Sequence, residues 1–272
     1  MTSINTNVGA LNARSNAITA TGKMENAMQR LSSGLRINSA ADDAAGLAVA
    51  GKMQSQLMGI NMSVRNAQDG IGAIQTAEAG LNEIRNMVLR IRELAVQMAN
   101  GIYENTPDRQ NAQLEVTALL NQVDLISSNT DFNDIALLDG TFSAVTIQAG
   151  NTTAETISIS FADVGQSGLS ITGASIATQA SATTVIGTMD SAIETIATQQ
   201  ATMGSLINRL NFSVANLSKA SVMTEQAIGR VMDADFAQET TNLSKQQILN
   251  QAATSMLAQA NQAKQSILAL LQ

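Results

Sequence analysis

Apolar side chains recur at alternating steps of three and four residues over most of the chain, which is the spacing of one face of an α-helix. The pattern predicts long helices over residues 44–100, 107–128 and 184–232. Gly101 is a stop for the first, and the Thr-Pro-Asp sequence at 106–108 opens the second, with its threonine as N-cap. The longest series occupies the third, at Ile186, Met189, Ile193, Ile196, Gln200, Met203, Ile207, Leu210, Val214, Leu217, Ser221, Thr224, Ile228 and Val231. We therefore expect a mainly α-helical protein.

The middle of the chain, residues 131–182, is rich in Gly, Thr, Ser and Asn instead. Two short segments there, Val-Thr-Ile at 145–147 and Ile-Ser-Ile-Ser-Phe at 157–161, alternate apolar and polar side chains. They flank Gly-Asn-Thr-Thr at 150–153, a sequence typical of turns. This arrangement predicts a small β-hairpin between the helices.

Both ends of the chain carry narrow apolar stripes with heptad-like spacing. The stripe residues are Ile4, Val8, Leu11 and Ile18 near the start, and Met256, Ala260, Ala263 and Ile267 near the end. Their flanks are mostly Asn, Gln, Ser, Thr and Ala, so two such helices bury little apolar surface to offset the ordering entropy. We expect residues 1–40 and 235–272 to become well ordered only when several chains surround them.

The composition removes several classes of chemistry. The chain has no Cys and no His, so disulfide bonds, histidine-based catalysis and histidine metal ligands are excluded. Its net charge of −7 disfavours a nucleic-acid partner. The start lacks the features of a cleaved signal peptide, and no apolar run is long enough to span a membrane.

Three segments suggest a binding site only superficially. Residues 46–53 resemble a phosphate-binding loop, but Met53 replaces the hydroxyl that would hold Mg²⁺, and the apolar sequence continues a helix. The adjacent Asp42 and Asp43 suit a helix N-terminus better than a metal site. The carboxylates within 131–139 lack the spacing of a calcium loop. We expect no catalytic residue, no cofactor and no metal.

Long motifs along the whole chain resemble those of bacterial flagellin. They are SINTNVGALNA at 3–13, RLSSGLRINSAADDAAGLAVA at 30–50, IRELAVQMANG at 91–101, FNDIALLDG at 132–140 and MTEQAIGRVMDADFAQETTNLSKQQILNQAATSMLAQANQ at 223–262. The resemblance implies that the paired terminal segments, residues 1–43 and 233–272, form a coiled coil that lines an inner tube. Residues 44–232 would form a trunk domain of long helices with the hairpin, and there is no room for a separate variable outer domain.

The segment at 29–50 would then be the joint between the two domains. Ser32, Ser33 and Gly34 would let the chain change direction, and Asp42 and Asp43 would cap the long helix that follows.

The family resemblance also implies a function and partners. The chain would be a structural subunit that polymerises with copies of itself into the extracellular flagellar filament, which acts as a propeller for swimming. Type III export would carry it, an export chaperone would hold residues 232–272, and flagellar cap and junction proteins would contact it. No nucleic acid, no membrane insertion and no enzymatic activity are implied.

An animal Toll-like receptor recognises some flagellins. The matching stretch here is LRIRELAVQ at 89–97, with Leu89 in place of the family's Gln. Arg90, Leu94 and Glu115 are the corresponding residues for an assembly interface and a possible receptor contact.

Other functions are disfavoured but remain open. A hook–filament junction protein of the same flagellar family would share the coiled-coil termini. A filament peptidase would need histidines that the chain lacks, and a free adhesin would not explain both matched ends.

Overall fold

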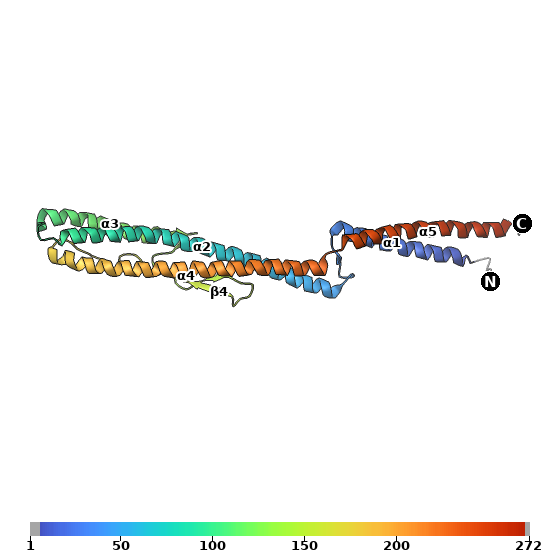
Figure 1. Ribbon diagram of the computed structural model, residues 1–272, viewed down its shortest axis with the longest axis horizontal. Helices are drawn as coiled ribbons and strands as arrows, with labels where there is room; N and C mark the ends of the chain where they lie inside the picture. The colour runs from blue at the N-terminus through green and yellow to red at the C-terminus, as the bar shows by residue number, and fades with distance from the viewer. Residues whose placement is uncertain (1–5, 270–272) are drawn as a thin grey trace. The chain divides into compact units, whose positions relative to one another are not determined.

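The structure, a computed structural model, describes residues 6–269 and the side chains of residues 6–263. The described residues form long helices and two short strand pairs (Figure 1). In order these are α1 (Val8–Ser33), α2 (Ala44–Met98), the π-helical turn η1 (Asn105–Arg109), α3 (Gln110–Asn129), β1 (Asp131–Phe132), β2 (Ile135–Ala136), β3 (Val145–Gln148), β4 (Thr156–Ile159), α4 (Gln179–Met232) and α5 (Phe236–Ala269). The predicted fold class is confirmed. The chain divides into two compact units, unit 1 (residues 1–57 and 222–272) and unit 2 (residues 58–221).

In unit 1, α1 lies antiparallel beside α5 (Figure 1). The contact face of α1 is built from alanines: Ala13, Ala20 and Ala27 are buried at a spacing of seven residues. On α5, Ala253 is buried at the matching face. Small side chains on both sides let the two backbones approach closely, as in other tightly packed helix pairs.

Polar contacts cross this alanine seam at three levels. The Asn7 side chain donates to the carbonyl oxygen of Ala260 at 3.0 Å, and it also accepts from the main-chain N–H of Ala10 as the N-cap of α1. Asn250 donates to the Thr21 hydroxyl at 2.6 Å. Near the other end, Arg30 donates to Glu239 at 3.1 Å. Each contact joins residues more than 200 positions apart in the sequence.

Unit 2 is built on one apolar core shared by α2, α3, α4 and the hairpin. Its fully buried members include Ile84, Val88, Ile91, Val116, Val123, Met189 and Ile196. The helices are also joined at the rim of this core by exposed polar contacts: Arg92 pairs with Asp190 at 2.6 Å, and Gln200 donates to Asn82 at 2.7 Å. The three-and-four spacing read from the sequence therefore corresponds to real core faces.

The predicted hairpin is present as β3 paired with β4, with Val145 opposite Ile159 and Gln148 opposite Thr156. It packs on α2, where the Asn66 side chain donates to the carbonyl oxygen of Gln148 at 3.2 Å. The two-residue strands β1 and β2 form a second antiparallel pair that the sequence pattern did not predict. A pair this short carries too little alternation to be recognised.

Several predicted helix boundaries differ. Helix α2 ends at Met98 instead of residue 100, and α4 begins at Gln179, five positions before the predicted start. Helix α3 begins at Gln110, three positions after the predicted start, and the π-helical turn η1 precedes it. Thr106 has a φ of −136° and a ψ of 124°, the extended conformation that an N-cap residue adopts. Asp108 accepts from the main-chain N–H of Glu104 at 3.3 Å.

Candidate assembly surfaces

The large apolar side chains of α1 lie on its outer face. Val8, Leu11 and Ile18 are 57%, 55% and 63% exposed, because the helical repeat places them opposite the alanine seam. This corrects the terminal stripe. Val8 and Leu11 do not line the contact with α5, although the sequence pattern selected them as the largest apolar residues of that segment.

Helix α5 shows the same arrangement. Met256 is 64% exposed and Ala263 is exposed, so neither lies at the seam, whereas Ala260 is half-buried and accepts the hydrogen bond from Asn7. Ile4 and the Ile267 side chain lie outside the described residues. Ile248 and Leu249 are also exposed on α5.

A groove of about 680 Å³ follows one side of the α1–α5 pair. Leu249 and Met256 of α5 form its apolar part, and Asn12, Asn16 and Lys23 of α1 form its polar part. Unit 1 therefore presents apolar surface on the outer face of α1 and along this groove. Large apolar side chains left exposed on two helices of one unit are candidates for contact with another chain.

The joint after α1 turns on a glycine. Gly34 has a φ of +74°, a left-handed conformation that L side chains rarely adopt, and its N–H donates to the carbonyl oxygen of Arg30. Ser33 accepts from the main-chain N–H of Leu35 at 3.1 Å and from the Asn38 side chain at 2.9 Å. Ser32 is exposed beside them. These contacts hold the change of chain direction that the sequence predicted here.

The same segment pairs with the connection between α4 and α5. The N–H of Arg36 donates to the carbonyl oxygen of Met232 at 2.6 Å, and the N–H of Ala234 donates to that of Gly34 at 2.9 Å. Leu35 forms an isolated antiparallel bridge with Asp233. Main-chain hydrogen bonds therefore join the connection between α1 and α2 to the connection between α4 and α5.

The two adjacent aspartates of the joint have different roles. Asp43 caps α2 as predicted, by accepting from the N–H of Gly46 at 2.8 Å. Asp42 does not cap the helix: it accepts from the main-chain N–H groups of Asn38 and Ser39 and from the Ser39 hydroxyl. The hydrogen bonds from Ser39 hold the pKa of Asp42 below its ordinary value of 3.8.

Arg30 connects the joint to the start of α5. Its guanidinium lies 3.6 Å from a carboxylate oxygen of Asp42 and 3.1 Å from one of Glu239. Glu239 is buried, and Arg30 is the cation that pairs with its carboxylate. No local sequence pattern indicates the Arg30–Glu239 pair, because the two residues are 209 positions apart.

On unit 2, Arg90 of α2 and Glu115 of α3 are both exposed. Their side chains pair at 2.9 Å, and Arg90 also pairs with Glu93 at 2.7 Å. The hydrogen bond that Arg90 donates to the Glu115 carboxylate raises the pKa of Arg90 above its ordinary value. Leu94, predicted to belong to this surface, is 4% exposed and lies in the core. Leu89 is the exposed apolar neighbour instead, at 39%.

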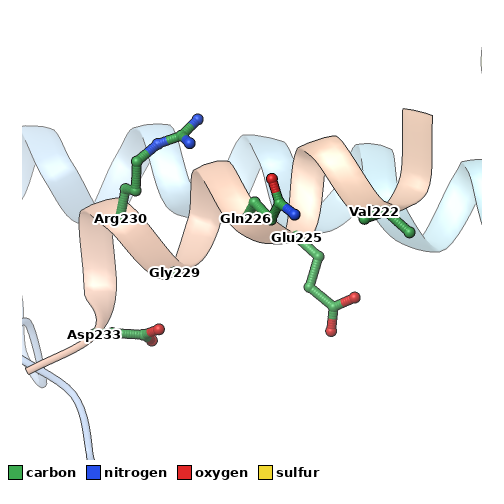
Figure 2. A pocket seen from close by; sticks show the side chains of 6 residues that line it. All are labelled: Val222, Glu225, Gln226, Gly229, Arg230 and Asp233. Atoms are coloured by element: carbon green, nitrogen blue, oxygen red, sulfur yellow. The ribbon is translucent and has the colours of Figure 1, made fainter. Parts of the chain in front are cut away.

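A further surface pocket lies on the last turns of α4 (Figure 2). It is lined by Val222, Glu225, Gln226, Gly229, Arg230 and Asp233. Figure 2 shows Arg230 pointing to the opposite side of the helix from Glu225 and Asp233, so the charged groups do not converge on one ligand.

The segments with superficial resemblance to binding sites have ordinary structural places. Residues 46–53 continue helix α2, and Lys52 is exposed on it. Among the described side chains, no group of three or more acidic residues is placed to hold a metal ion. None of the described helices combines the length and apolar character needed to cross a membrane.

Comparison with known proteins assigns the family. The family described as "Bacterial flagellin N-terminal helical region" matches residues 4–143, and "Bacterial flagellin C-terminal helical region" matches residues 186–271. Flagellin of Bacillus subtilis (strain 168) is 38% identical over 301 residues, with 98% of this chain and 99% of that protein covered. The flagellar filament 33 kDa core protein of Treponema phagedenis is 39% identical over 290 residues, with the same coverage.

A solved structure agrees with this assignment. The crystal structure of Bacillus cereus flagellin matches with a TM-score of 0.52 and 34% identity, over 56% of this chain and 88% of that one. The family matches cover both terminal helical regions, and the relatives match this chain over nearly its full length. The chain therefore belongs to the bacterial flagellin family.

Proposed function

We propose that copies of this chain join in the flagellar filament through the outer face of α1 and the exposed apolar side chains of α5. As a flagellin, the chain is a structural subunit of the filament, and motility follows from that role. One observation carries the assignment of the surface: alanines fill the α1–α5 seam, whereas Leu11 and Ile18 are more than half exposed. Burying such side chains between copies contributes about 1.5–3 kcal/mol for each.

The test is polymerisation of purified monomer onto filament seeds, followed by electron microscopy and sedimentation. The double variant Leu11→Ser, Ile18→Ser should lose elongation while its far-UV circular dichroism stays that of the wild type. Asn26→Ser, an exposed substitution on the same helix, is the matched control and should elongate normally. Normal filament yield from the double variant would show that the outer face of α1 is not an assembly surface.

The joint is proposed to set how the terminal pair enters the filament. Gly34 holds the turn and Asp43 holds the start of α2, and neither residue belongs to the core of unit 2. Substituting either should reduce polymerisation more than it reduces the stability of unit 2. If Gly34→Ala and Asp43→Ala both gave the filament yield of the wild type, the joint would not be a determinant of assembly.

An export chaperone is proposed to hold the C-terminal segment, residues 232–272, before assembly. The support is the apolar surface of α5, where Ile248 and Leu249 are exposed and need cover in a monomer. Co-purification of the full chain with the flagellin chaperone of its own organism tests this. The double variant Ile248→Ser, Leu249→Ser should lose co-purification, and an unchanged yield would contradict the proposal. Export to the cell exterior by the type III route, and contact with cap and junction proteins, are further parts of the proposed role.

Activation of an animal Toll-like receptor by the monomer is proposed to depend on Arg90 and Glu115. Both are exposed, on neighbouring helices, and paired with each other. A reporter-cell assay should show activation by wild-type monomer and a weaker response to Arg90→Ala. No response to the wild type, alongside a response to a known flagellin, would refute it.

The junction-protein alternative has no observation in its favour, since both family matches are to flagellin itself. Seeded monomer that forms long tubes alone identifies a filament subunit, whereas a junction protein would not.

A further inference from the structure

Unit 2 contains an apolar cavity of about 270 Å³ beside the hairpin. Its walls come from α2, the two strand pairs and the segments next to them. The lining residues include Asn66, Asp69, Phe132, Ile135, Phe142 and Phe161. A cavity of about 150 Å³ lined by apolar side chains is known to admit benzene, so this one has room for an aromatic ring.

The cavity is built into the fold and is open to solvent. Phe142 and Phe161 stack with their ring centroids 5.0 Å apart, and both are buried, which fixes one wall. Phe132 and Ile135 at the rim are 36% and 50% exposed, so apolar surface faces water at the opening. Apolar walls offer water few hydrogen bonds, so displacement of that water by an apolar occupant is favourable.

One charged group stands at the rim. Asp69 is exposed on α2, and its carboxylate has no hydrogen bond or ion pair with the described side chains. Arg65, one turn earlier, contacts the sulfur of Met62 at 3.6 Å. Asn66, the other polar side chain of the lining, is already bonded to Gln148. A group with an apolar part and a positive charge could fill the cavity with the first and pair with the Asp69 carboxylate through the second.

The chain itself offers such a group on a different surface. Phe212 of α4 is 77% exposed and lies opposite the face of α4 that packs in the core, where Leu210 is fully buried. Arg209 lies three residues before Phe212 and is exposed, so the two side chains share one face of the helix. Arg209 has no carboxylate partner among the described residues.

We propose that Phe212 of one copy inserts into this cavity of a neighbouring copy, where Arg209 pairs with Asp69. The inference rests on the filament role and names a contact within it. The donor surface and the acceptor cavity are different parts of the molecule, so the contact is heterologous: it leaves a free surface at each end and can propagate. Contacts of this kind generate helical polymers, whereas a self-complementary contact would stop at a dimer.

Charge exchange tests the pairing. Asp69→Arg or Arg209→Asp alone places like charges together and should lower the seeded elongation rate by about tenfold. The double variant with both substitutions restores opposite charges and should recover most of the wild-type rate. Thermal melts of the three monomers should match the wild type, because both residues are exposed. A double variant that melts like the wild type but stays as slow as the single variants would overturn the pairing.

Disulfide trapping tests the location. The chain has no cysteine, so a disulfide can form only between introduced residues. Copies carrying Ile135→Cys and copies carrying Phe212→Cys, mixed and polymerised, should give a covalent dimer on oxidation in filaments and none in dilute monomer. Leu114→Cys, on an exposed part of α3, replaces Phe212→Cys as the control and should give none.

The failures are distinguishable. If wild-type monomer does not elongate on seeds, the filament role itself is wrong. If it elongates and the single charge variants match it, or no Ile135–Phe212 dimer forms, the filament role stands and this contact is wrong.

Discussion

The guanidinium of Arg109 donates to the main-chain carbonyl oxygen of Met98 at 2.9 Å, at the last residue of the 55-residue helix α2. Further hydrogen bonds run from the same side chain to the carbonyl oxygens of Asn100 and Tyr103 and to the side chain of Asn105. Arg109 is 3% exposed. One buried side chain therefore satisfies the free carbonyl groups at the end of α2 and fixes the turn into α3.

Replacing Arg109 by Leu should destabilise unit 2 by about 2–4 kcal/mol, because several buried carbonyl oxygens lose their donor together. Urea unfolding of the monomer, followed by circular dichroism, measures the change. Arg92→Leu is the control: Arg92 pairs with Asp190 at an exposed site, so its loss should matter little. Equal effects of the two substitutions would contradict the role assigned to Arg109.

Two glycines of α2 should respond in opposite directions to alanine. A methyl group at Gly46 would contact the Asp43 carboxylate and lie 2.7 Å from a methyl carbon of Ile37, whereas Gly51 has open space around it. Gly51→Ala should stabilise the helix by about 0.5–1 kcal/mol through propensity.

For Gly46→Ala the steric conflict outweighs that gain, since it displaces the cap of α2. Differential scanning calorimetry of both variants measures the difference. A higher melting temperature for Gly46→Ala than for the wild type would show that the joint accommodates the added methyl group without losing stability.

The joint should lose stability in acid through Asp42. The hydrogen bonds from Ser39 lower the pKa of Asp42 in the folded protein. The ionised carboxylate therefore stabilises the joint fully when the pH is above the ordinary pKa of 3.8. That contribution disappears as the pH falls through the lowered value. The difference in stability between wild type and Asp42→Asn should be constant from about pH 7 to 5 and shrink below about pH 3.8. A difference that persists unchanged to about pH 2.5 would exclude this role of Asp42.

In dilute monomer, a protease should cut first within residues 1–40 and 235–272. The α1–α5 seam buries chiefly alanine methyl groups, each contributing about 0.8 kcal/mol, against an ordering cost of about 1–2 kcal/mol per residue. Limited proteolysis with mass spectrometry measures the sites, and filaments should protect the same segments. Termini that resist cleavage in the monomer as well as unit 2 does would contradict this expectation.

The long helices and the hairpin could be predicted because their signals are local. Three-and-four spacing along α4, and the alternation on either side of residues 150–153, depend only on neighbouring residues. The same local logic failed on α1, where it selected Val8 and Leu11 for the seam over Ala13 and Ala20. Periodicity shows that a helix has an apolar stripe, but not which neighbour the stripe faces.

The site residues show the same limit. Leu94 lies beside Arg90 in a conspicuous motif, yet the core of unit 2 covers it. Arg109 has no sequence signal at all, because its partners become acceptors only when α2 ends and the chain turns back. The cavity beside Asp69 likewise depends on where the hairpin packs.

An alanine seam does not by itself define the register of two helices, because methyl groups at a spacing of seven residues pack equally well after a shift of one heptad. The contacts Asn7–Ala260, Thr21–Asn250 and Arg30–Glu239 would all be broken by such a slide, and a buried carboxylate would lose its cation. These polar contacts therefore set the register of α1 against α5. Every subunit then presents its outward apolar side chains at the same positions along the helix pair, which a polymer of identical subunits requires.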